Sequence, residues 1–344
     1  MSRFRKPSLD GFEPYIPGIQ PPDSEEWVKL NTNESPFPPA PGVRDAIDAM
    51  VDRLPLYPDP AQTEFRQAVA EALDVGSEMV VAGNGADEVL AMAVRAYVPA
   101  GGRVAYLEPS YTLVPKLCAI NDVLGEEHAF ADGYHLPRSF VESEAQLKFV
   151  TNPNSPTGTL IPLSEIADLC RASAGVILLD EAYVDFAPES GLEILDQHEN
   201  LLLVRTMSKS YSLAGLRVGF AIGAPDLVAD LWAVKDICNV GRLPLAAATA
   251  AMRDRKHWRR GVDDTIFNRQ RLTADLTARA WDVLPSSSNF IFAIPPVPAS
   301  EVYQHLLLRK VLVRYFTRPS VSHGVRISIG TRGQCQAFLD ALQA

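Results

Sequence analysis

An unbroken apolar run that ends in a carboxylate constrains the fold of this chain more than any other feature. The run is Val176-Ile-Leu-Leu179, and Asp180-Glu-Ala-Tyr183 follows it directly. Consecutive apolar residues without polar alternation are typical of a parallel strand that is buried on both faces. Leu201–Val204 shows the same pattern and predicts a second buried strand. The chain is therefore expected to contain a parallel sheet that helices cover on both sides.

Strand and helix patterns alternate from about residue 43 to residue 231, as in an α/β domain with a mostly parallel sheet. The expected strands are Arg103–Tyr106, Leu147–Thr151, Val176–Leu179 and Leu201–Val204, and the expected helices include Thr63–Leu73 and Asp87–Tyr97. We assign residues 41–240 to this large domain and expect its sheet to be of the seven-stranded type.

The two ends of the chain differ from this middle part. The first forty residues are rich in proline, which suits an extended arm that wraps a partner subunit. Residues 241–344 are expected to form a smaller α+β domain. Its expected elements are helix Arg259–Ala280, strand Phe290–Ile294, helix Ser300–Arg309, strand Leu312–Tyr315 and strand Val325–Ile329.

Composition and charge exclude several classes of protein. The net charge of −10 argues against a polyanionic partner, and the basic cluster Arg253–Arg260 is expected to be a solvated helix face, so nucleic-acid binding is not expected. No apolar stretch is long enough to span a bilayer, and none follows the basic N-terminus as in a signal peptide. The cysteines form no C-x-x-C pair and the histidines no ligand spacing, so we expect a cytoplasmic protein without a metal site.

A single lysine lies in a cluster of hydroxyls directly after the second buried strand. Lys209 is surrounded in sequence by Thr206, Ser208, Ser210 and Ser212, and Arg217 follows eight residues later. A buried lysine must lose its charge or find a partner. This setting favours covalent attachment to an anionic aldehyde and so indicates pyridoxal phosphate (PLP), with the hydroxyls and the arginine on the phosphate. A surface loop between a strand and a helix would explain this motif alone equally well.

Asp180 makes the PLP hypothesis more specific. Ligands of open α/β sheets bind at the carboxyl ends of the strands, and a carboxylate buried there needs a cation. A protonated pyridine nitrogen is such a cation, and Tyr183 could then reach the phenolic oxygen of the same ring. A magnesium-dependent nucleotide hydrolase would also place acids after an apolar strand, but it requires a G-x-x-x-x-G-K-[ST] loop, which this chain lacks.

A glycine turn in the first half of the large domain is a candidate phosphate site. The segment Gly83-Asn-Gly85-Ala86-Asp87-Glu88 predicts a turn that opens a helix, whose free backbone N–H groups would attract an anion. Glu88 stands where a dinucleotide fingerprint would need a third glycine. A purely structural turn explains the segment at least as well.

Taken in order, these motifs resemble the fold type I aminotransferases, and among them most of all the histidinol-phosphate aminotransferase family. The likeness runs almost from end to end and is specific because the motifs are collinear. They are Glu13-Pro-Tyr15, Leu30-Asn-Thr-Asn33, Tyr57-Pro-Asp-Pro60, Gly83–Glu88, Glu108-Pro-Ser-Tyr111, Asn152–Gly158, Asp180–Tyr183, Ser208-Lys209, Arg217 and Val325–Arg332.

The resemblance implies a role for each matching residue. Lys209 corresponds to the Schiff-base lysine, Asp180 to the partner of the pyridinium nitrogen, Tyr183 to the donor to the phenolic oxygen, and Tyr111 to the residue stacked on the ring. The implied phosphate site contains Gly85, Ala86, Thr206, Ser208 and Arg217, and Tyr57 would reach it from the partner subunit of a homodimer. Asp87 is a further implied cofactor-binding residue. The implied substrate contacts are Arg326, Arg314, Tyr15 and Asn33.

The chain departs from the family at Ser155. The family usually has asparagine directly before Pro-Thr-Gly, where its amide bonds the phenolic oxygen of the cofactor. Here Ser155 either bonds this oxygen more loosely or is replaced in that role by Asn154. Loss of one neutral hydrogen bond would cost about 1 kcal/mol, which is too little to abolish cofactor binding.

The function implied by the resemblance is amino transfer between histidinol phosphate and 2-oxoglutarate, with ping-pong kinetics, in histidine biosynthesis. Arg326 suits a carboxylate and Arg314 a phosphate, although a solvated Arg314 stays possible at this point. An aromatic amino acid aminotransferase shares every motif, and a threonine-phosphate decarboxylase shares the fold and the cofactor motifs. A PLP-binding regulator would usually carry a DNA-binding segment, for which neither end of the chain leaves room.

Overall fold

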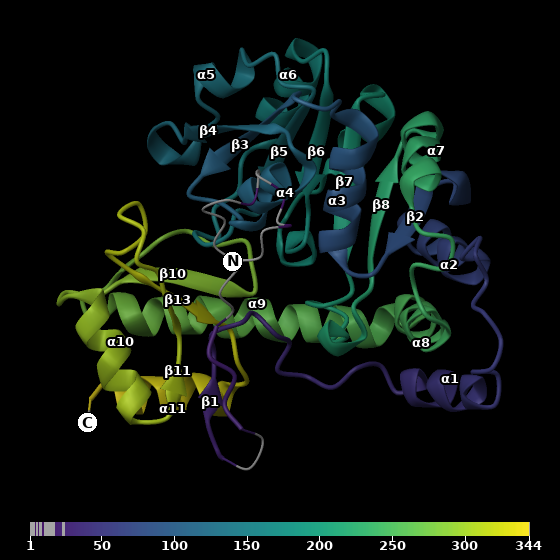
Figure 1. Ribbon diagram of the computed structural model, residues 1–344. Helices are drawn as coiled ribbons and strands as arrows, with labels where there is room; N and C mark the ends of the chain where they lie inside the picture. Colours follow the sequence, from purple (N-terminus) through teal and green to yellow (C-terminus); the bar gives the residue numbers. More distant parts are fainter. Residues whose placement is uncertain (1–3, 5, 7–8, 10–17, 23–24, 344) are drawn as a thin grey trace.

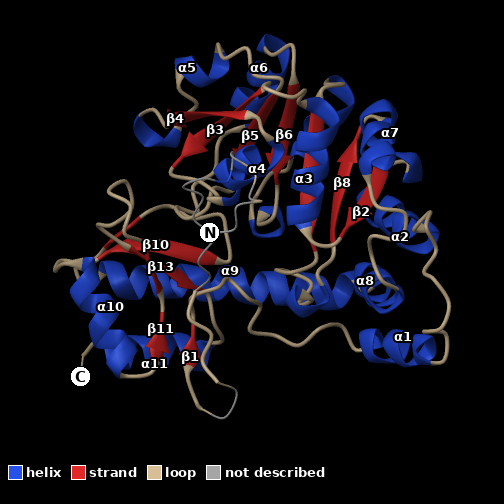
Figure 2. Ribbon diagram, viewed as in Figure 1, coloured by secondary structure: helices blue, strands red, loops and turns tan. Residues whose placement is uncertain are grey.

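The computed structural model describes residues 4, 6, 9, 18–22 and 25–343. A large unit contains a sheet with helices on both faces, and a smaller unit contains a second sheet (Figures 1 and 2). The long helix α9 (Arg255–Thr277) runs across the middle of the view in Figure 1, from the side of α8 to the strands of the small unit. The α/β class, the large domain with its covered sheet and the smaller α+β part are confirmed.

The large sheet has seven strands in the order β2-β8-β7-β6-β5-β3-β4. Only β8 runs antiparallel to its neighbours, so the sheet is mostly parallel, as the apolar runs predict. The strands are β2 (Val80–Gly83), β3 (Arg103–Glu108), β4 (Leu124–Ala129), β5 (Leu147–Thr151), β6 (Val176–Asp180), β7 (Leu201–Thr206) and β8 (Gly219–Gly223).

The central strands are buried on both faces because helices cover each side. On one face, side chains of α3 (Ala86–Tyr97), α4 (Leu113–Asn121) and α7 (Pro225–Val234) pack against alternate residues of the strands. On the other, α2 (Thr63–Leu73), α6 (Leu163–Ala172) and α8 (Arg242–Arg253) do the same. Burial of both strand faces explains why β6 and β7 lack any polar alternation.

The small unit is an antiparallel sheet of order β12-β13-β10-β9 that packs against helices. Its strands are β9 (Asp282–Val283), β10 (Phe290–Ile294), β12 (Arg314–Tyr315) and β13 (Val325–Ser328), and its helices are α10 (Ala299–Leu308) and α11 (Arg332–Ala341). Near the N-terminus, β1 (Val28–Lys29) pairs in parallel with β11 (Val311–Leu312), and Leu30 belongs to the core of this unit. The segment from Val28 to Leu30 therefore belongs to the small unit.

Three elements differ from the sequence expectations. The expected strand 312–315 is two strands, because β11 pairs with β1 whereas β12 pairs with β13. The long helix begins at Arg255, where the Asp254 side chain caps it, and ends at Thr277. Helix α8 packs against α2 and against α1 (Gly42–Val51), so the core of the large unit extends past residue 240.

Within the described part of the chain, no helix is both long and apolar enough to cross a membrane.

Candidate active site

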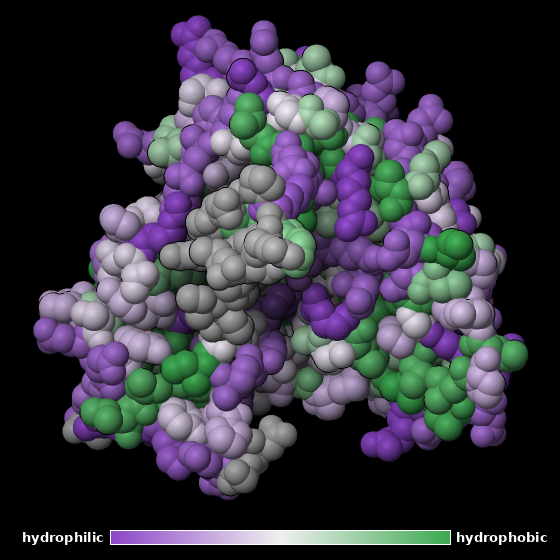
Figure 3. Space-filling model, viewed as in Figure 1, coloured by the Kyte–Doolittle hydropathy of each residue, from purple (hydrophilic) through white to green (hydrophobic). Residues whose placement is uncertain are grey.

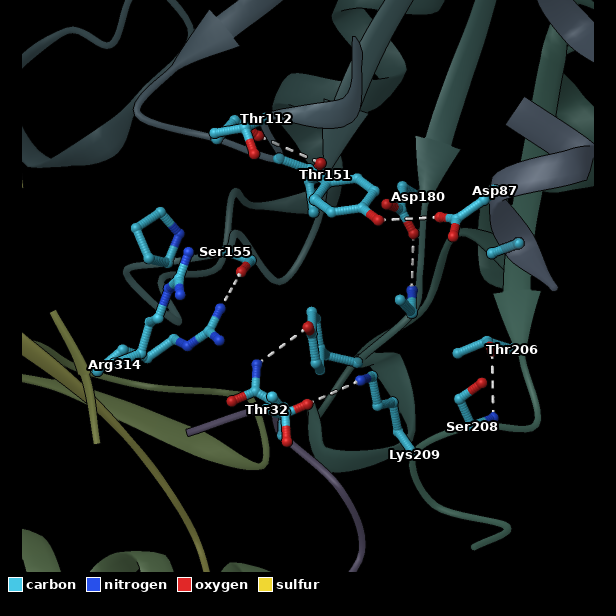
Figure 4. A pocket seen from close by; sticks show the side chains of 18 of the residues that line it. Thr32, Asp87, Thr112, Thr151, Ser155, Asp180, Thr206, Ser208, Lys209 and Arg314 are labelled. Atoms are coloured by element: carbon cyan, nitrogen blue, oxygen red, sulfur yellow. Dashed lines mark hydrogen bonds between the residues drawn. The ribbon is translucent and has the colours of Figure 1, made fainter. Parts of the chain in front are cut away.

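A cavity of about 300 Å³ lies where the large sheet meets the small unit. Its floor is formed by the carboxyl ends of β5, β6 and β7, and one side by the N-terminus of α3. Residues 31–33 and the small unit close the opposite side (Figure 4). The lining residues at the floor are Thr151, Asp180, Thr206 and Ser208, and those from the small unit are Arg314, Phe316 and Arg326.

Lys209 reaches into the cavity from the loop after β7. Its Nζ donates a hydrogen bond to the backbone oxygen of Thr32 at 3.4 Å and lies 5.7 Å from the centre of the Tyr183 ring. Among the described residues that line the cavity it is the one amine. Because a guanidinium does not release its proton in proteins, Lys209 is also the one basic side chain there that can act as a proton acceptor and donor.

Two hydroxyls beside Lys209 stabilise its loop without reaching the cavity. Ser210 donates to the carboxylate of Asp185, which also accepts a hydrogen bond from Trp258 Nε1 of α9 at 3.4 Å. Ser212 donates to Ser35 Oγ at 2.8 Å. The hydroxyl cluster read from the sequence therefore divides into a pair on the cavity, Thr206 and Ser208, and a pair that anchors the loop.

Asp180 lies at the carboxyl end of β6 and is 5% exposed. Its Oδ1 accepts a hydrogen bond from the Ala182 N–H at 3.0 Å. The pKa of Asp180 is raised to about 7, mainly by burial and to a smaller extent by the nearby carboxylates of Asp87 and Glu181, while the Ala182 hydrogen bond and Lys209 oppose the shift. A cation placed above Asp180 would reverse this shift, so the site suits the protonated ring nitrogen of a heteroaromatic ligand.

Asp87 joins two residues of the opposite wall. It accepts a hydrogen bond from the Tyr111 hydroxyl at 2.9 Å and pairs with Arg217 Nη2 at 3.1 Å. Gly85 has a φ of +83°, and a Cβ there would meet the Arg217 guanidinium. A Cβ at Gly219 would collide with the backbone nitrogen of Ala86. The two glycines thus let the turn, the arginine and the start of α3 converge into a cradle that fits an anion.

Asn33 connects the N-terminal segment to both units. Its side-chain amide donates to the Tyr183 hydroxyl at 3.1 Å, and its Oδ1 accepts from Ser328 Oγ of β13 at 2.9 Å. Asn289 donates to its backbone oxygen at 3.0 Å. Tyr183 in turn packs edge-on against Phe290 at 5.0 Å between ring centres. This buried network fixes the Tyr183 hydroxyl at the boundary between the units.

Two arginines of the small unit lie directly opposite each other across an antiparallel pair. Arg314 of β12 is in register with Arg326 of β13, and both line the cavity. Like charges in such a cross-strand position destabilise a sheet unless an anion lies between them. The guanidinium of Arg326 donates to Ser155 Oγ and to the Asn31 backbone oxygen, each at 3.1 Å. Both guanidiniums also lie over the Phe316 ring, at 5.4 and 5.5 Å from its centre.

Comparison with known proteins agrees with this geometry. The family described as aminotransferase class I and II matches residues 25–342. The chain belongs to this family.

Its similarity to named relatives covers nearly the whole chain. It is 39% identical to a histidinol-phosphate aminotransferase of Geobacter sulfurreducens, over 96% of this chain and 95% of the relative. It is 41% identical to one of Rhodopirellula baltica, over 97% and 93%. Among solved structures, the histidinol-phosphate aminotransferase of Sinorhizobium meliloti, in complex with pyridoxal-5'-phosphate, has a TM-score of 0.89 at 25% identity and covers 99% of this chain and 97% of its own.

Most residues proposed for the site of this aminotransferase converge on the cavity. The lining includes Lys209, Asp180, Tyr183, Tyr111, Ala86, Asp87, Ser155, Thr206, Ser208, Arg217, Arg326, Arg314 and Asn33. Gly85 is not among the lining residues. It lies against the Arg217 guanidinium and allows the turn to approach this arginine closely. Tyr15 lies outside the described residues.

Two proposed residues lie elsewhere. Asn154 is fully buried, and its amide donates to the Pro109 backbone oxygen at 2.9 Å and to Thr157 Oγ1 at 2.8 Å. It therefore stabilises the loop, and Ser155 alone of the two faces the cavity. Tyr57 is 85% exposed, and its backbone oxygen accepts a hydrogen bond from Arg242. Within a single chain it contributes nothing to the cavity.

Several lining residues were not identified from the sequence, among them Thr151, Thr32 and Phe316. Thr151 could have been found, because it is the last residue of a predicted parallel strand and so lies at the ligand-binding edge. Thr32 contributes a backbone oxygen, which no side-chain motif reveals. Phe316 lies in the connection after β12, where no periodicity marks it.

Proposed function

We propose that the protein is a PLP-dependent histidinol-phosphate:2-oxoglutarate aminotransferase that acts as a homodimer. The observation that carries the proposal is one cavity whose two ends suit different groups, a cationic aromatic ring at one end and an anion at the other. At its floor, a buried carboxylate and a single amine, Asp180 and Lys209, suit a cationic aromatic aldehyde. At its other end, the facing pair Arg314 and Arg326 suits an anionic substrate.

The cavity residues fit PLP. Lys209 would attach it covalently, Asp180 would keep its ring nitrogen protonated, Tyr111 would support the ring, and the Tyr183 hydroxyl would donate to the phenolic oxygen. Gly85, Ala86, Thr206, Ser208 and Arg217 form the phosphate cradle, with Asp87 orienting Tyr111 and Arg217. When bound, PLP supplies an electron sink for the bond that is broken at the substrate carbon.

Lys209 performs the proton transfer of the reaction. Among the described lining residues it is the one amine, and the Thr32 backbone oxygen and the Tyr183 ring hold it between the cofactor side and the substrate side. The Lys209 amine, when unprotonated, can take the proton from the substrate carbon and return it to a neighbouring atom. Asp180 is too deeply buried to serve as this base.

The pair Arg314 and Arg326 accounts for substrate choice. Glutamate and histidinol phosphate bind in turn in one pocket, so the pocket must accept both a carboxylate and a phosphate. A forked guanidinium binds either group with two hydrogen bonds, and a second guanidinium adds the charge that a phosphate dianion requires. The relatives named as histidinol-phosphate aminotransferases, at 36 to 41% identity, support this substrate.

Absorbance of the cofactor provides the test. The PLP-loaded protein is mixed with histidinol phosphate, with phenylalanine or tyrosine, or with threonine phosphate. Conversion to the amine form by histidinol phosphate, reversed by 2-oxoglutarate, is the expected result. Conversion by aromatic amino acids alone would identify an aromatic aminotransferase, and release of carbon dioxide without any oxo acid would identify a decarboxylase.

Exposed apolar side chains near Tyr57 support the homodimer. Val51, Leu54 and Leu56 are 47%, 54% and 59% exposed, and Tyr57 follows them directly. An apolar area occupies the corner of the molecule where α1 and α8 lie (Figures 1 and 3). Such a patch is typical of a protein interface. In the dimer Tyr57 would reach the partner's phosphate cradle.

The dimer is tested with Leu56→Glu, which places a charge in the apolar patch. We expect analytical ultracentrifugation to show a dimer for the unchanged protein and monomers for the variant. A monomeric unchanged protein that is fully active would contradict this part of the proposal.

A further inference from the structure

The connection between β12 and β13, residues 316–324, links the small unit to the large sheet. It begins next to Arg314 with Phe316, which lines the cavity, and then reaches strands β3 and β4. The contacts that it makes there lie more than 190 residues away in sequence. A segment that lines the substrate side and is fastened to the other unit can control the shape of the pocket.

Three polar contacts fasten this connection. Arg318 Nη1 pairs with Glu108 Oε2 at 2.9 Å, and Arg318 Nη2 pairs with Glu127 Oε2 at 3.2 Å. Ser320 Oγ donates to the other oxygen of Glu108, Oε1, at 2.7 Å. Both oxygens of Glu108 are therefore bound by one short segment of the small unit.

These ion pairs differ from ordinary surface pairs in two ways. The side chain of Glu108 is only 14% exposed, so its charge is less screened than those of Arg318 and Glu127, each 44% exposed. In addition, the two carboxylates come from adjacent parallel strands, and one guanidinium between them relieves their mutual repulsion. Arg318 is thus the shared cation of a small network rather than half of an isolated pair.

The fastened segment connects the two sides of the cavity. Glu108 is followed after Pro109 and Ser110 by Tyr111, on the cofactor side. Arg318 is two residues from Phe316, whose ring lies beneath the guanidiniums of Arg314 and Arg326. Displacement of Arg318 would move the aromatic support of both arginines.

We propose that Arg318 is a positioning residue for substrate binding: by pairing with Glu108 and Glu127 it holds Phe316 against Arg314 and Arg326, which fixes the anion-binding end of the pocket. This inference rests on the proposed function, because it takes the two arginines as the anion site. Arg318 does not touch the cavity itself. Its loss should weaken the binding of anionic substrates and leave cofactor attachment intact.

The test compares Arg318→Ala and Arg318→Lys with Arg332→Ala, which removes an exposed arginine elsewhere on the small unit. For the PLP-loaded enzymes we expect Arg318→Ala to raise KM for histidinol phosphate about fivefold, the effect of losing a partly exposed charge pair. We expect kcat to change less than twofold and the inhibition constant of inorganic phosphate to rise in parallel. Arg318→Lys should restore part of the loss, and Arg332→Ala should change neither constant.

Two further measurements exclude a merely structural role. Added salt should raise KM of the unchanged enzyme by a larger factor than KM of Arg318→Ala, because it weakens anion binding in both enzymes but weakens the Arg318 pairs only in the unchanged one. Glu108→Gln combined with Arg318→Ala should raise KM by less than the product of the single effects. An unchanged KM and phosphate constant in Arg318→Ala, or an equal change in Arg332→Ala, would overturn the inference.

Failure of the proposed function gives a different result. If glutamate but not histidinol phosphate converts the bound cofactor to its amine form, histidinol phosphate is not a substrate of the enzyme. The same variants are then compared for KM of glutamate and for inhibition by phosphate. A rise specific to Arg318→Ala still supports the positioning role, and no rise contradicts it.

Discussion

The cofactor side and the substrate side of the cavity are built in different ways. On the cofactor side, Asp180, Thr206 and Ser208 are buried at or just after the ends of strands in a seven-stranded sheet. On the substrate side, Arg314 lies on a strand of two residues and Phe316 lies in the connection that follows it. One side is fixed by the core of the large unit, and the other is held by cross-strand pairing and a few polar contacts.

We infer from this difference that the floor of the cavity carries out the reaction and that the wall determines which substrate binds. A rigid, desolvated floor suits groups whose charge and position must stay constant through the reaction. A wall with fewer buried contacts can move when the substrate binds, and such regions have lower local stability. We therefore expect changes at the floor to lower kcat by orders of magnitude and changes at the wall to act mainly on KM.

The largest effect is expected for Lys209→Ala. Removal of the proton-transferring amine should lower kcat by about 10⁴-fold, the upper end for loss of a positioned acid–base group. Stopped-flow measurement of the glutamate half-reaction checks this expectation. Lys256→Ala, at an exposed position of α9, is the matched control and should retain full activity. Retention of more than a tenth of the activity in Lys209→Ala would remove Lys209 from the mechanism.

The next effect is expected for Asp180→Asn. The amide keeps the size of the side chain but cannot keep a ring nitrogen protonated, so kcat should fall by about 10² to 10³-fold. KM should change much less, since the substrate arginines are untouched. Steady-state kinetics separate the two constants, and a pure KM effect would contradict the division between floor and wall.

Asp180 also predicts a pH dependence of stability in the protein without PLP. Its folded-state pKa of about 7 lies above the ordinary value of 3.8, so the folded state binds the proton more tightly than the unfolded state. Stability should therefore fall as pH rises from about 4 to about 7, by an amount on the order of a few kcal/mol. Denaturant titrations at several pH values should show this loss, and Asp180→Asn should remove it. Equal pH profiles for the two proteins would contradict the buried, uncompensated charge.

At the substrate wall, Arg326→Ala should raise KM for both substrates by about 10 to 100-fold, the range for loss of a charged hydrogen-bonding group. Arg314→Ala should raise KM for histidinol phosphate by a similar factor but leave KM for glutamate nearly unchanged. Steady-state measurement with each substrate in turn tests both variants. Equal effects of Arg314→Ala on both substrates would show that Arg314 is not a phosphate-selective residue.

The smallest effect is expected for Ser155→Ala. Its hydroxyl accepts a hydrogen bond from Arg326, and loss of one such bond costs about 1 kcal/mol, which corresponds to about a fivefold change in kcat/KM. Thr157→Val on the same loop is not a suitable control, because Thr157 bonds Asn154 within the loop. Ser164→Ala, at an exposed position of α6, is suitable and should have no effect. A hundredfold loss in Ser155→Ala would mean that Ser155 contacts the cofactor directly.

The sequence predicted the floor of the site better than its wall. Buried parallel strands carry a continuous apolar signal, so β5 was predicted with its observed ends. Strand β4 is a polar edge strand, Leu-Gly-Glu-Glu-His-Ala, and lacks that signal. The substrate wall depends on long-range contacts, such as the ion pair between Arg318 and Glu108, which are 210 residues apart in sequence. No local pattern encodes such a contact.

The positions of two further site residues relative to the cavity could not be predicted from the sequence. The role carried over to Tyr57 depends on a second subunit, and in the single chain this residue is 85% exposed. The choice between Asn154 and Ser155 depended on side-chain direction, which the buried hydrogen bonds of Asn154 decide. Spacing alone carries no information about either point.

The central claim is that Lys209 binds PLP covalently above Asp180, and reduction with borohydride tests it most directly. PLP-loaded protein is reduced, digested and examined by peptide mass spectrometry, with Lys256 as an internal comparison. The account predicts a phosphopyridoxyl mass on the peptide that contains Lys209 and none on the peptide that contains Lys256. An unmodified Lys209 peptide, or a loaded protein without visible absorbance, would contradict it.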